Sequence, residues 1–145
     1  MNDNTFVDTN VLVYSRDASK RSKQVQAAEW MSHLWRTGNG RLSMQVVNEY
    51  YAVVTGKLKP GLDVSNARED VEDLLTWRPL PLTPDLLFEA WRIQDLFQLS
   101  WWDSLIVAAA KMLQCTYLLS EDFQHFQDFQ GIRVINPFQA RPDEL

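Results

Sequence analysis

Four acidic residues stand far apart along this chain, at positions that an α/β fold could bring together: Asp8, Glu49, Asp103 and Asp122. Asp8 and Asp122 come directly or shortly after apolar segments that are typical of buried strands. The other two lie on, or at the start of, predicted helices. In an open parallel sheet, such positions converge on the crevice outside the carboxyl ends of the strands. Gathered carboxylates repel one another unless a cation lies between them, so the pattern favours a divalent metal and phosphodiester hydrolysis.

Asp8 and Glu49 each have an ordinary structural role open to them. An aspartate that follows a strand is a common N-cap of the next helix. Thr9 and Asn10 add side chains that could instead orient this carboxylate toward a metal. Glu49 lies at the edge of an apolar helix stripe rather than on the solvated face. Residue type and spacing alone leave both interpretations of Asp8 and Glu49 open.

Asp103 and Asp122 also have alternative roles. Ser100 precedes Asp103 by three positions, as in a capping box, and the positive end of that helix would help to keep the carboxylate ionised. Asp122 could be a turn residue after its strand. Glu121 competes with Asp122 for a place in the site, and spacing does not decide which of the two points inward.

Length and composition favour one folded domain over residues 1–145. Of the 145 residues, 46% are hydrophobic, well above the content of a disordered chain. A net charge of −5 argues against a protein that coats nucleic acid by bulk positive charge, but not against an enzyme with a local basic patch. The densest basic stretch is either such a patch, which would touch phosphates, or the solvated start of a helix. It comprises Arg16, Lys20, Arg21 and Lys23.

The remaining reactive side chains do not point to other chemistry. Cys115 is the one cysteine, so no internal disulfide can form, and it has the setting of a small buried hydrophobe. His33 and His125 lie apart from the acidic positions, as surface or boundary residues, and no Cys or His cluster suggests zinc. Because neither a signal peptide nor an apolar run of about 20 residues is apparent, we expect a cytoplasmic protein.

Apolar patterning predicts short strands that alternate with helices, the order of a parallel sheet covered on both faces. The predicted strands cover residues 5–7, 41–43, 80–82, 116–120 and 132–135. The predicted helices cover residues 11–14, 19–36, 43–57, 65–77 and 84–97, and a last, almost wholly apolar helix begins after Ser100. We therefore expect an α/β fold with a central parallel sheet of about five short strands and helices on both faces.

The segments around the acidic residues resemble the motifs of the PIN-domain nucleases, and among them the VapC-type toxins of bacterial type II toxin–antitoxin systems. Four segments carry the resemblance: FVDTNVL at 6–12, Asn48-Glu49, WDSLIVAAA at 102–110 and LLSEDF at 118–123. The third is the most specific of them. The ending GIRVINPF at 131–138 is similar to the tail of many such toxins, so the resemblance covers nearly the whole chain.

The resemblance implies a metal site of four carboxylates with two supporting polar side chains. The carboxylates, which would be both catalytic and metal-binding, are Asp8, Glu49, Asp103 and Asp122, and the supporting residues are Asn10 and Ser120. It also selects Asp122 over Glu121. An all-carboxylate site suits Mg²⁺ or Mn²⁺ as the cofactor. The implied activity is that of a metal-dependent endoribonuclease, which hydrolyses RNA phosphodiester bonds.

The resemblance further implies a single PIN-like domain with a doubly wound sheet, a homodimer, and a cognate antitoxin whose C-terminal segment blocks the active site. An apolar groove beside the helix predicted at 43–57 would suit an amphipathic antitoxin segment. Most of the six tryptophans have the spacing of core or interface residues. Trp101, which is close to Asp103, is the one that we expect to contact RNA or the antitoxin.

Three other functions share part of this pattern. A Mg²⁺-binding phospho-acceptor domain normally needs a lysine after a late strand, and none follows residues 117–120. A phosphatase with an aspartate nucleophile usually has a second aspartate two positions later, where this chain has Asn10. A PIN-like domain that has lost catalysis and only binds a partner is a third alternative, although four intact carboxylates argue against it.

Overall fold

The computed structural model describes residues 3–145, and within them five strands form one sheet. They are β1 (Thr5–Val7), β2 (Gly40–Arg41), β3 (Tyr117–Leu119), β4 (Asp128–Phe129) and β5 (Ile132–Ile135). Their order across the sheet is β2-β1-β3-β5-β4. β1 pairs in parallel with β2 and β3, and β3 with β5, whereas β4 and β5 are antiparallel. The expected α/β fold with a largely parallel sheet is confirmed.

The strand order reverses at β1. The chain passes from β1 to β2 on one side of it and later returns to β3 on the other side. The register pairs Phe6 with Leu118, so β1 and β3 end side by side, and the N–H of Asp8 donates to the carbonyl of Leu119 at 3.0 Å. Such a reversal opens a crevice at the carboxyl ends of the strands. The residues that follow β1 and β3 therefore meet at this crevice.

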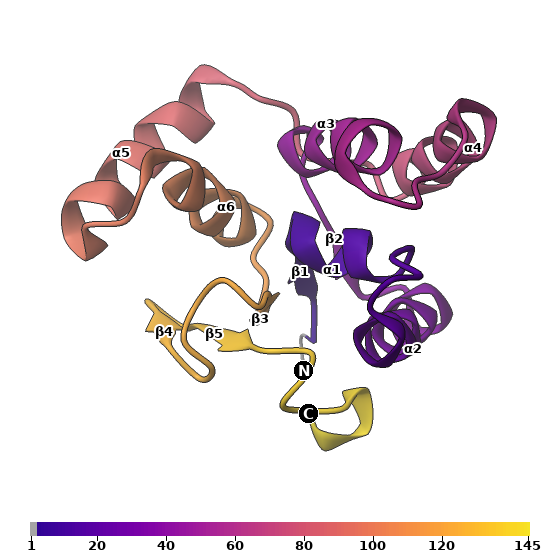
Figure 1. Ribbon diagram of the computed structural model, residues 1–145. Coiled ribbons are helices and arrows are strands. Elements are labelled where there is room, and N and C mark those ends of the chain that lie inside the picture. Colours follow the sequence, from indigo (N-terminus) through magenta and orange to yellow (C-terminus); the bar gives the residue numbers. More distant parts are fainter. Residues whose placement is uncertain (1–2) are drawn as a thin grey trace.

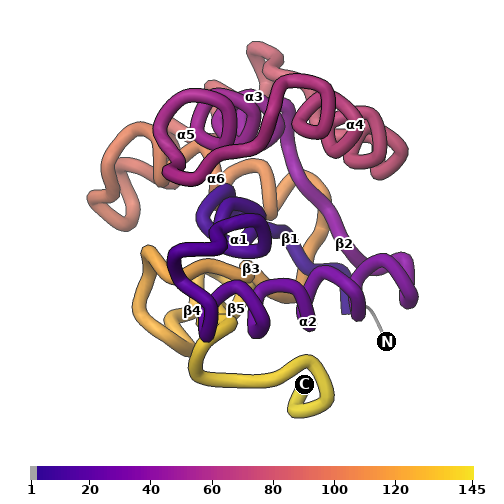
Figure 2. The backbone as a smooth tube through the Cα atoms, turned by 45° about the vertical axis from the view of Figure 1, so that its right-hand side comes forward, coloured from indigo at the N-terminus to yellow at the C-terminus, as the bar shows by residue number. Residues whose placement is uncertain are grey.

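Helices cover the sheet from both sides (Figure 1). They are α1 (Thr9–Tyr14), α2 (Arg21–Thr37), α3 (Met44–Ala52) with its π-helical continuation η1 (Val53–Lys57), α4 (Val64–Leu75), α5 (Pro84–Phe97), α6 (Trp101–Met112) and the short 3-10 helix η2 (Pro142–Glu144). α1 and α2 lie on one side of β1, and α5 and α6 lie on the other. Figure 2 shows α3 and α4 together at the end of the molecule opposite the C-terminus. Among these described helices, none has the length and apolar character needed to cross a membrane.

The predicted helix starts are correct where a hydroxyl side chain precedes the helix. Ser43, Thr83 and Ser100 lie in extended backbone and accept hydrogen bonds from N–H groups in the first turns of α3, α5 and α6. Residues 105–110 of α6 are all buried, which confirms a central helix. The helix predicted at 43–57 is in fact two structures, because the α-helix becomes a π-helix at Val53.

The strand predicted at 80–82 is wrong. Leu80 forms one isolated bridge with Ser43, and 64% of Leu82 is exposed. Prolines stand on both sides of Leu80, and a proline has no N–H to donate to a neighbouring strand. The remaining strand of the sheet is instead β4, which the sequence pattern did not predict. A tight turn joins β4 to β5 through Gln130 and Gly131, whose φ angles are 53° and 96°.

Candidate functional site

Asp8 is a buried carboxylate at the carboxyl end of β1, and only 6% of it is exposed. Its Oδ1 accepts a hydrogen bond from the N–H of Thr9 at 2.8 Å, so it caps α1. Its Oδ2 accepts from the hydroxyl of Ser120 at 2.7 Å, and Ser120 directly follows β3. The capping role and a place in the crevice are therefore compatible.

Asn10 joins the segment after β1 to the segment after β3. Its Nδ2 donates to Oδ2 of Asp122 at 3.1 Å and to Oγ of Ser120 at 3.2 Å. Its Oδ1 accepts from the N–H of Glu121 at 3.1 Å. The N–H of Asp122 also donates to Oγ of Ser120, at 3.0 Å. The carboxylate of Asp122 therefore faces the residues after β1.

Glu49 reaches the same group of residues from α3. The hydroxyl of Thr9 donates to Oε1 of Glu49 at 2.9 Å. Because the N–H of Thr9 also donates to Asp8, this one residue contacts two of the four predicted carboxylates. Glu49 is half-buried, as expected at the edge of an apolar stripe. Three of the four carboxylates are thus linked through the polar residues that follow β1 and β3.

Asp103 lies in the first turn of α6, where its N–H donates to Oγ of Ser100 at 3.2 Å. Partial burial raises the pKa of Asp103, the hydrogen bond with Ser100 lowers it, and the negative charge of Asp122 raises it further. The net effect is a raised pKa. Desolvation is the largest of these effects. Asp122 is therefore close enough to act electrostatically on Asp103.

Burial raises the pKa of Asp8 to about 7. Hydrogen bonds from the Ser120 hydroxyl and the Thr9 N–H oppose this shift, and the negative charges of Asp122 and Glu49 add to it. Ionised Asp8 is therefore destabilised both by its loss of water and by its neighbours. A bound proton or a bound cation would relieve this repulsion.

The chemistry of the four carboxylates fits a hard divalent cation. All of their ligand atoms are oxygens, which Mg²⁺ and Mn²⁺ prefer. The ion pairs found within residues 3–145 use other carboxylates, namely Asp70, Glu121, Glu89 and Glu29. In that same range, no group of three or more His, Cys, Asp or Glu side chains is arranged to hold a metal ion. The four residues therefore suit a cation by charge and atom type, and their joint coordination of one stays a prediction.

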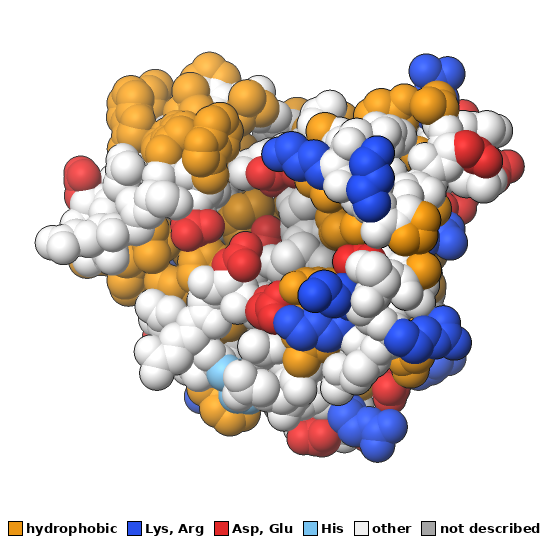
Figure 3. All heavy atoms as spheres, viewed as in Figure 1, with side chains coloured by type: hydrophobic (Ala, Val, Ile, Leu, Met, Phe, Trp, Pro, Cys, Tyr) orange, Lys and Arg blue, Asp and Glu red, His pale blue; other side chains and the backbone are white. Residues whose placement is uncertain are grey.

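The surface is hollowed between α1, α3 and α6 (Figure 3, viewed as in Figure 1). Acidic side chains gather around this hollow, and Lys and Arg side chains lie above it and to its lower right. An acidic protein with this distribution can hold an anionic chain locally, because positive charge on the rim faces its phosphates.

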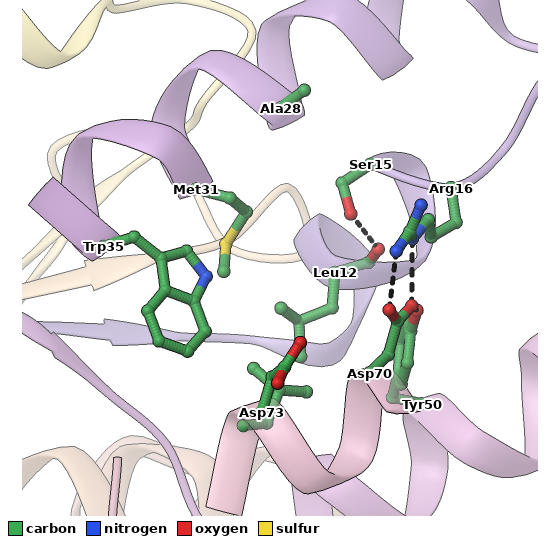
Figure 4. A pocket seen from close by; sticks show the side chains of 10 residues that line it. Leu12, Ser15, Arg16, Ala28, Met31, Trp35, Tyr50, Asp70 and Asp73 are labelled. Carbon is green, nitrogen blue, oxygen red and sulfur yellow. Dashed lines mark hydrogen bonds and ion pairs between the residues drawn. The ribbon is translucent and has the colours of Figure 1, made fainter. Parts of the chain in front are cut away.

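Two members of the predicted basic patch are paired with carboxylates. Nε and one terminal nitrogen of Arg16 contact Asp70 at 2.9 and 2.5 Å, and the hydroxyl of Tyr50 donates to the same carboxylate at 2.5 Å. Figure 4 shows Arg16 pointing at Asp70 beside Tyr50, at the edge of a pocket of about 290 Å³ that none of the four site carboxylates lines. Lys23 forms an ion pair with Glu121. These two basic residues therefore hold helices and loops together in the structure.

Trp102, rather than Trp101, is the exposed tryptophan beside Asp103. Trp101 is half-buried against the hydrophobic core, whereas 64% of Trp102 is exposed. The two residues precede the same apolar segment, so their spacing does not tell them apart. Trp102 is therefore the more accessible of the two tryptophans.

The cysteine and the histidines contact the protein rather than the carboxylates. Burial raises the pKa of the Cys115 thiol to about 12, which makes it a poor nucleophile. Nδ1 of His125 accepts the N–H of Asn136 at 3.0 Å, and His33 packs edge-on against Trp30. Both histidines are half-buried, in agreement with the expected boundary positions.

Comparison with known proteins agrees with the geometry. A family model described as "PIN domain" matches residues 5–131. The chain is similar to one in a solved "Toxin-antitoxin complex from Klebsiella pneumoniae", with a TM-score of 0.66 and 15% identity, over 92% of this chain and 98% of that chain. At this identity the likeness shows a shared fold, and none of the curated proteins matches. Because the family match runs from β1 to the turn before β5, the chain belongs to the PIN domain family.

Proposed function

We propose that this protein is a metal-dependent endoribonuclease and the toxin of a toxin–antitoxin pair. The observation that carries the proposal is the hydrogen-bonded set of carboxylates around buried Asp8, at the carboxyl ends of β1 and β3. Membership of the PIN domain family supports it, because such domains are typically nucleases. The fold shared with a chain of a toxin–antitoxin complex supports the toxin role.

Each carboxylate has a part in the proposed reaction. Asp8 and Asp103 would ligate Mg²⁺ or Mn²⁺, and a bound ion would supply an activated water and offset charge on the scissile phosphate. Glu49 and Asp122 would ligate directly or through water, and either is a candidate to accept the proton of the attacking water. The polar residues fix these groups: Thr9 holds Oε1 of Glu49, and Asn10 holds Oδ2 of Asp122.

The antitoxin would bind along α3 and α4. A pocket of about 390 Å³ lies between these helices, and Val47, Val71 and Leu75 are among the residues that line it. Arg68 and Glu72 give it a charged margin. An amphipathic segment could place apolar residues in this pocket and continue from it toward Glu49 on the same helix. This pocket matches the apolar groove expected beside α3, and an antitoxin segment is its proposed occupant.

A homodimer would form through α5. Phe88 and Trp91 project from this helix with ring centroids 5.5 Å apart, and 56% and 53% of them are exposed. Figure 3 shows hydrophobic side chains gathered over this part of the surface. Exposed aromatic clusters of this kind are typical of protein interfaces.

RNA cleavage by the purified protein tests the proposal. We expect cleavage of a mixed RNA substrate with Mn²⁺ or Mg²⁺, none with EDTA, and a loss of at least about 100-fold in Asp8→Asn. Asp95→Asn, which changes an exposed carboxylate on α5, serves as the matched control. Undiminished cleavage by folded Asp8→Asn would refute the site. Transfer of phosphate to an aspartate from a small phosphodonor, without RNA cleavage, would instead support the phospho-acceptor alternative.

A further inference from the structure

Lys23 makes more contacts than a surface lysine normally does. It forms an ion pair with Glu121, and its Nζ lies 3.5 Å from the hydroxyl of Tyr14. The same nitrogen lies 4.8 Å from the centroid of the Tyr14 ring and 4.9 Å from that of Phe138. These two rings pack edge to face at 5.1 Å. Two aromatic rings and one carboxylate therefore fix the position of this ammonium group.

The partner of Lys23 stands directly before a predicted metal ligand. Glu121 is bonded to Lys23 through its side chain and to Asn10 through its backbone N–H. Oδ2 of Asp122, the next residue, accepts a hydrogen bond from Nδ2 of the same Asn10. The loop after β3 is thus held by Asn10 of α1 and by Lys23 of α2.

We propose that Lys23 is a positioning residue for Asp122. By holding Glu121 against α2, it keeps that carboxylate directed away from the crevice and fixes the direction of the next side chain. Spacing alone does not distinguish Glu121 from Asp122. In the structure, Lys23 and Tyr14 hold the side chain of Glu121, whereas Asn10 holds that of Asp122. This inference rests on the proposed function of the four-carboxylate site.

A metal titration distinguishes a positioning role of Lys23 from a simple effect of its charge, because the two predict opposite changes in Mn²⁺ affinity. By Coulomb's law, removal of a positive charge near an acidic site strengthens the binding of a cation. If Lys23 positions Asp122, Lys23→Met weakens Mn²⁺ binding instead. We expect a weakening of about tenfold, at the lower end of the loss that follows removal of a group supporting a metal ligand. Lys20→Met, the same charge change three residues earlier, is the matched control and leaves the Mn²⁺ affinity unchanged or slightly tighter.

Three further variants show through which residue Lys23 acts. Lys23→Arg keeps the charge and the contact with the rings, and it restores the affinity to within about twofold of wild type. In an Asp122→Asn background, Lys23→Met has no additional effect, because the ligand that it positions is already gone. In a Glu121→Gln background, Lys23→Met likewise has no additional effect, because the carboxylate through which Lys23 acts is already gone.

Calorimetric Mn²⁺ titrations of these variants and of the wild type decide the matter. The positioning role is overturned if Lys23→Met binds Mn²⁺ as tightly as Lys20→Met does, or more tightly. It is also overturned if Lys23→Met weakens Mn²⁺ binding as much in the Asp122→Asn background as in the wild type. If Lys23 instead contacts RNA, Lys23→Met raises KM for RNA and leaves the Mn²⁺ affinity intact, which also overturns it. Absence of Mn²⁺ binding by the wild type is a separate result, and it contradicts the proposed function itself.

Discussion

The hydroxyl of Ser120 donates to Oδ2 of Asp8 across 2.7 Å, and this buried hydrogen bond joins residues 112 positions apart in the chain. The two residues directly follow β3 and β1, which are paired in parallel. The contact therefore depends on the register of the two strands, and it orients the carboxylate of Asp8.

Replacement of Ser120 by alanine should disorient Asp8 without disrupting the sheet. We expect Mn²⁺ affinity to fall by about tenfold, because a group that orients a ligand is lost, and stability to fall by about 1–2 kcal/mol. Calorimetry and urea unfolding measure the two quantities. Thr83→Ala removes a hydroxyl that caps α5, so it should cost about 1 kcal/mol of stability and leave the Mn²⁺ affinity unchanged. Equal Mn²⁺ affinities in Ser120→Ala and wild type would show that this hydrogen bond does not support the metal site.

The raised pKa of Asp8 predicts a dependence of stability on pH in the absence of metal. Burial raises this pKa from 3.8 to about 7, so the folded state binds a proton more tightly than the unfolded state does. The associated stability is fully present below the unfolded value and is lost as pH rises through about 7. Asp8→Asn does not ionise, so it should be more stable than wild type above pH 7, by on the order of 2–4 kcal/mol. Urea unfolding in EDTA from pH 4 upward checks this prediction, and a difference that does not grow with pH contradicts it.

Divalent metal should stabilise the folded protein by relieving the same repulsion. A ligand that binds only the native state contributes about 2.7 kcal/mol at a concentration 100 times its Kd. We therefore expect Mn²⁺ to raise Tm by several degrees at pH 7.5, EDTA to reverse the rise, and Asp8→Asn to abolish it. An identical rise in Asp8→Asn would locate the binding elsewhere on the protein.

The sequence could predict positions that follow from the order of the strands, but not contacts between side chains that lie far apart in the chain. Asp8 and Asp122 could be placed because each follows a recognisable strand, and strand ends converge by topology. The pairing of Arg16 with Asp70 could not be predicted, because Arg16 lies in the turn after α1, Asp70 lies 54 positions later in α4, and each has the pattern of a solvated residue. Similarly, the prolines beside Leu80 leave an extended segment that resembles a strand but cannot pair as one.

Trp102 offers a test of contact with the substrate. It is largely exposed in the first turn of α6, so its replacement by alanine should leave stability nearly unchanged. If its ring stacks on a base, Trp102→Ala should weaken RNA binding by about 1–3 kcal/mol, seen as a higher KM with a similar kcat. Trp101→Ala, which removes a half-buried ring packed on the core, should lower Tm instead. A wild-type KM in Trp102→Ala excludes the stacking contact.

The separation of the linked carboxylates along the polypeptide has a consequence for synthesis. Asp8 leaves the ribosome early, but its partners after β3 emerge only when most of the chain has been translated. A growing chain therefore lacks the complete set of carboxylates, and the proposed cleavage activity would arise only after the last parallel strands have joined the sheet.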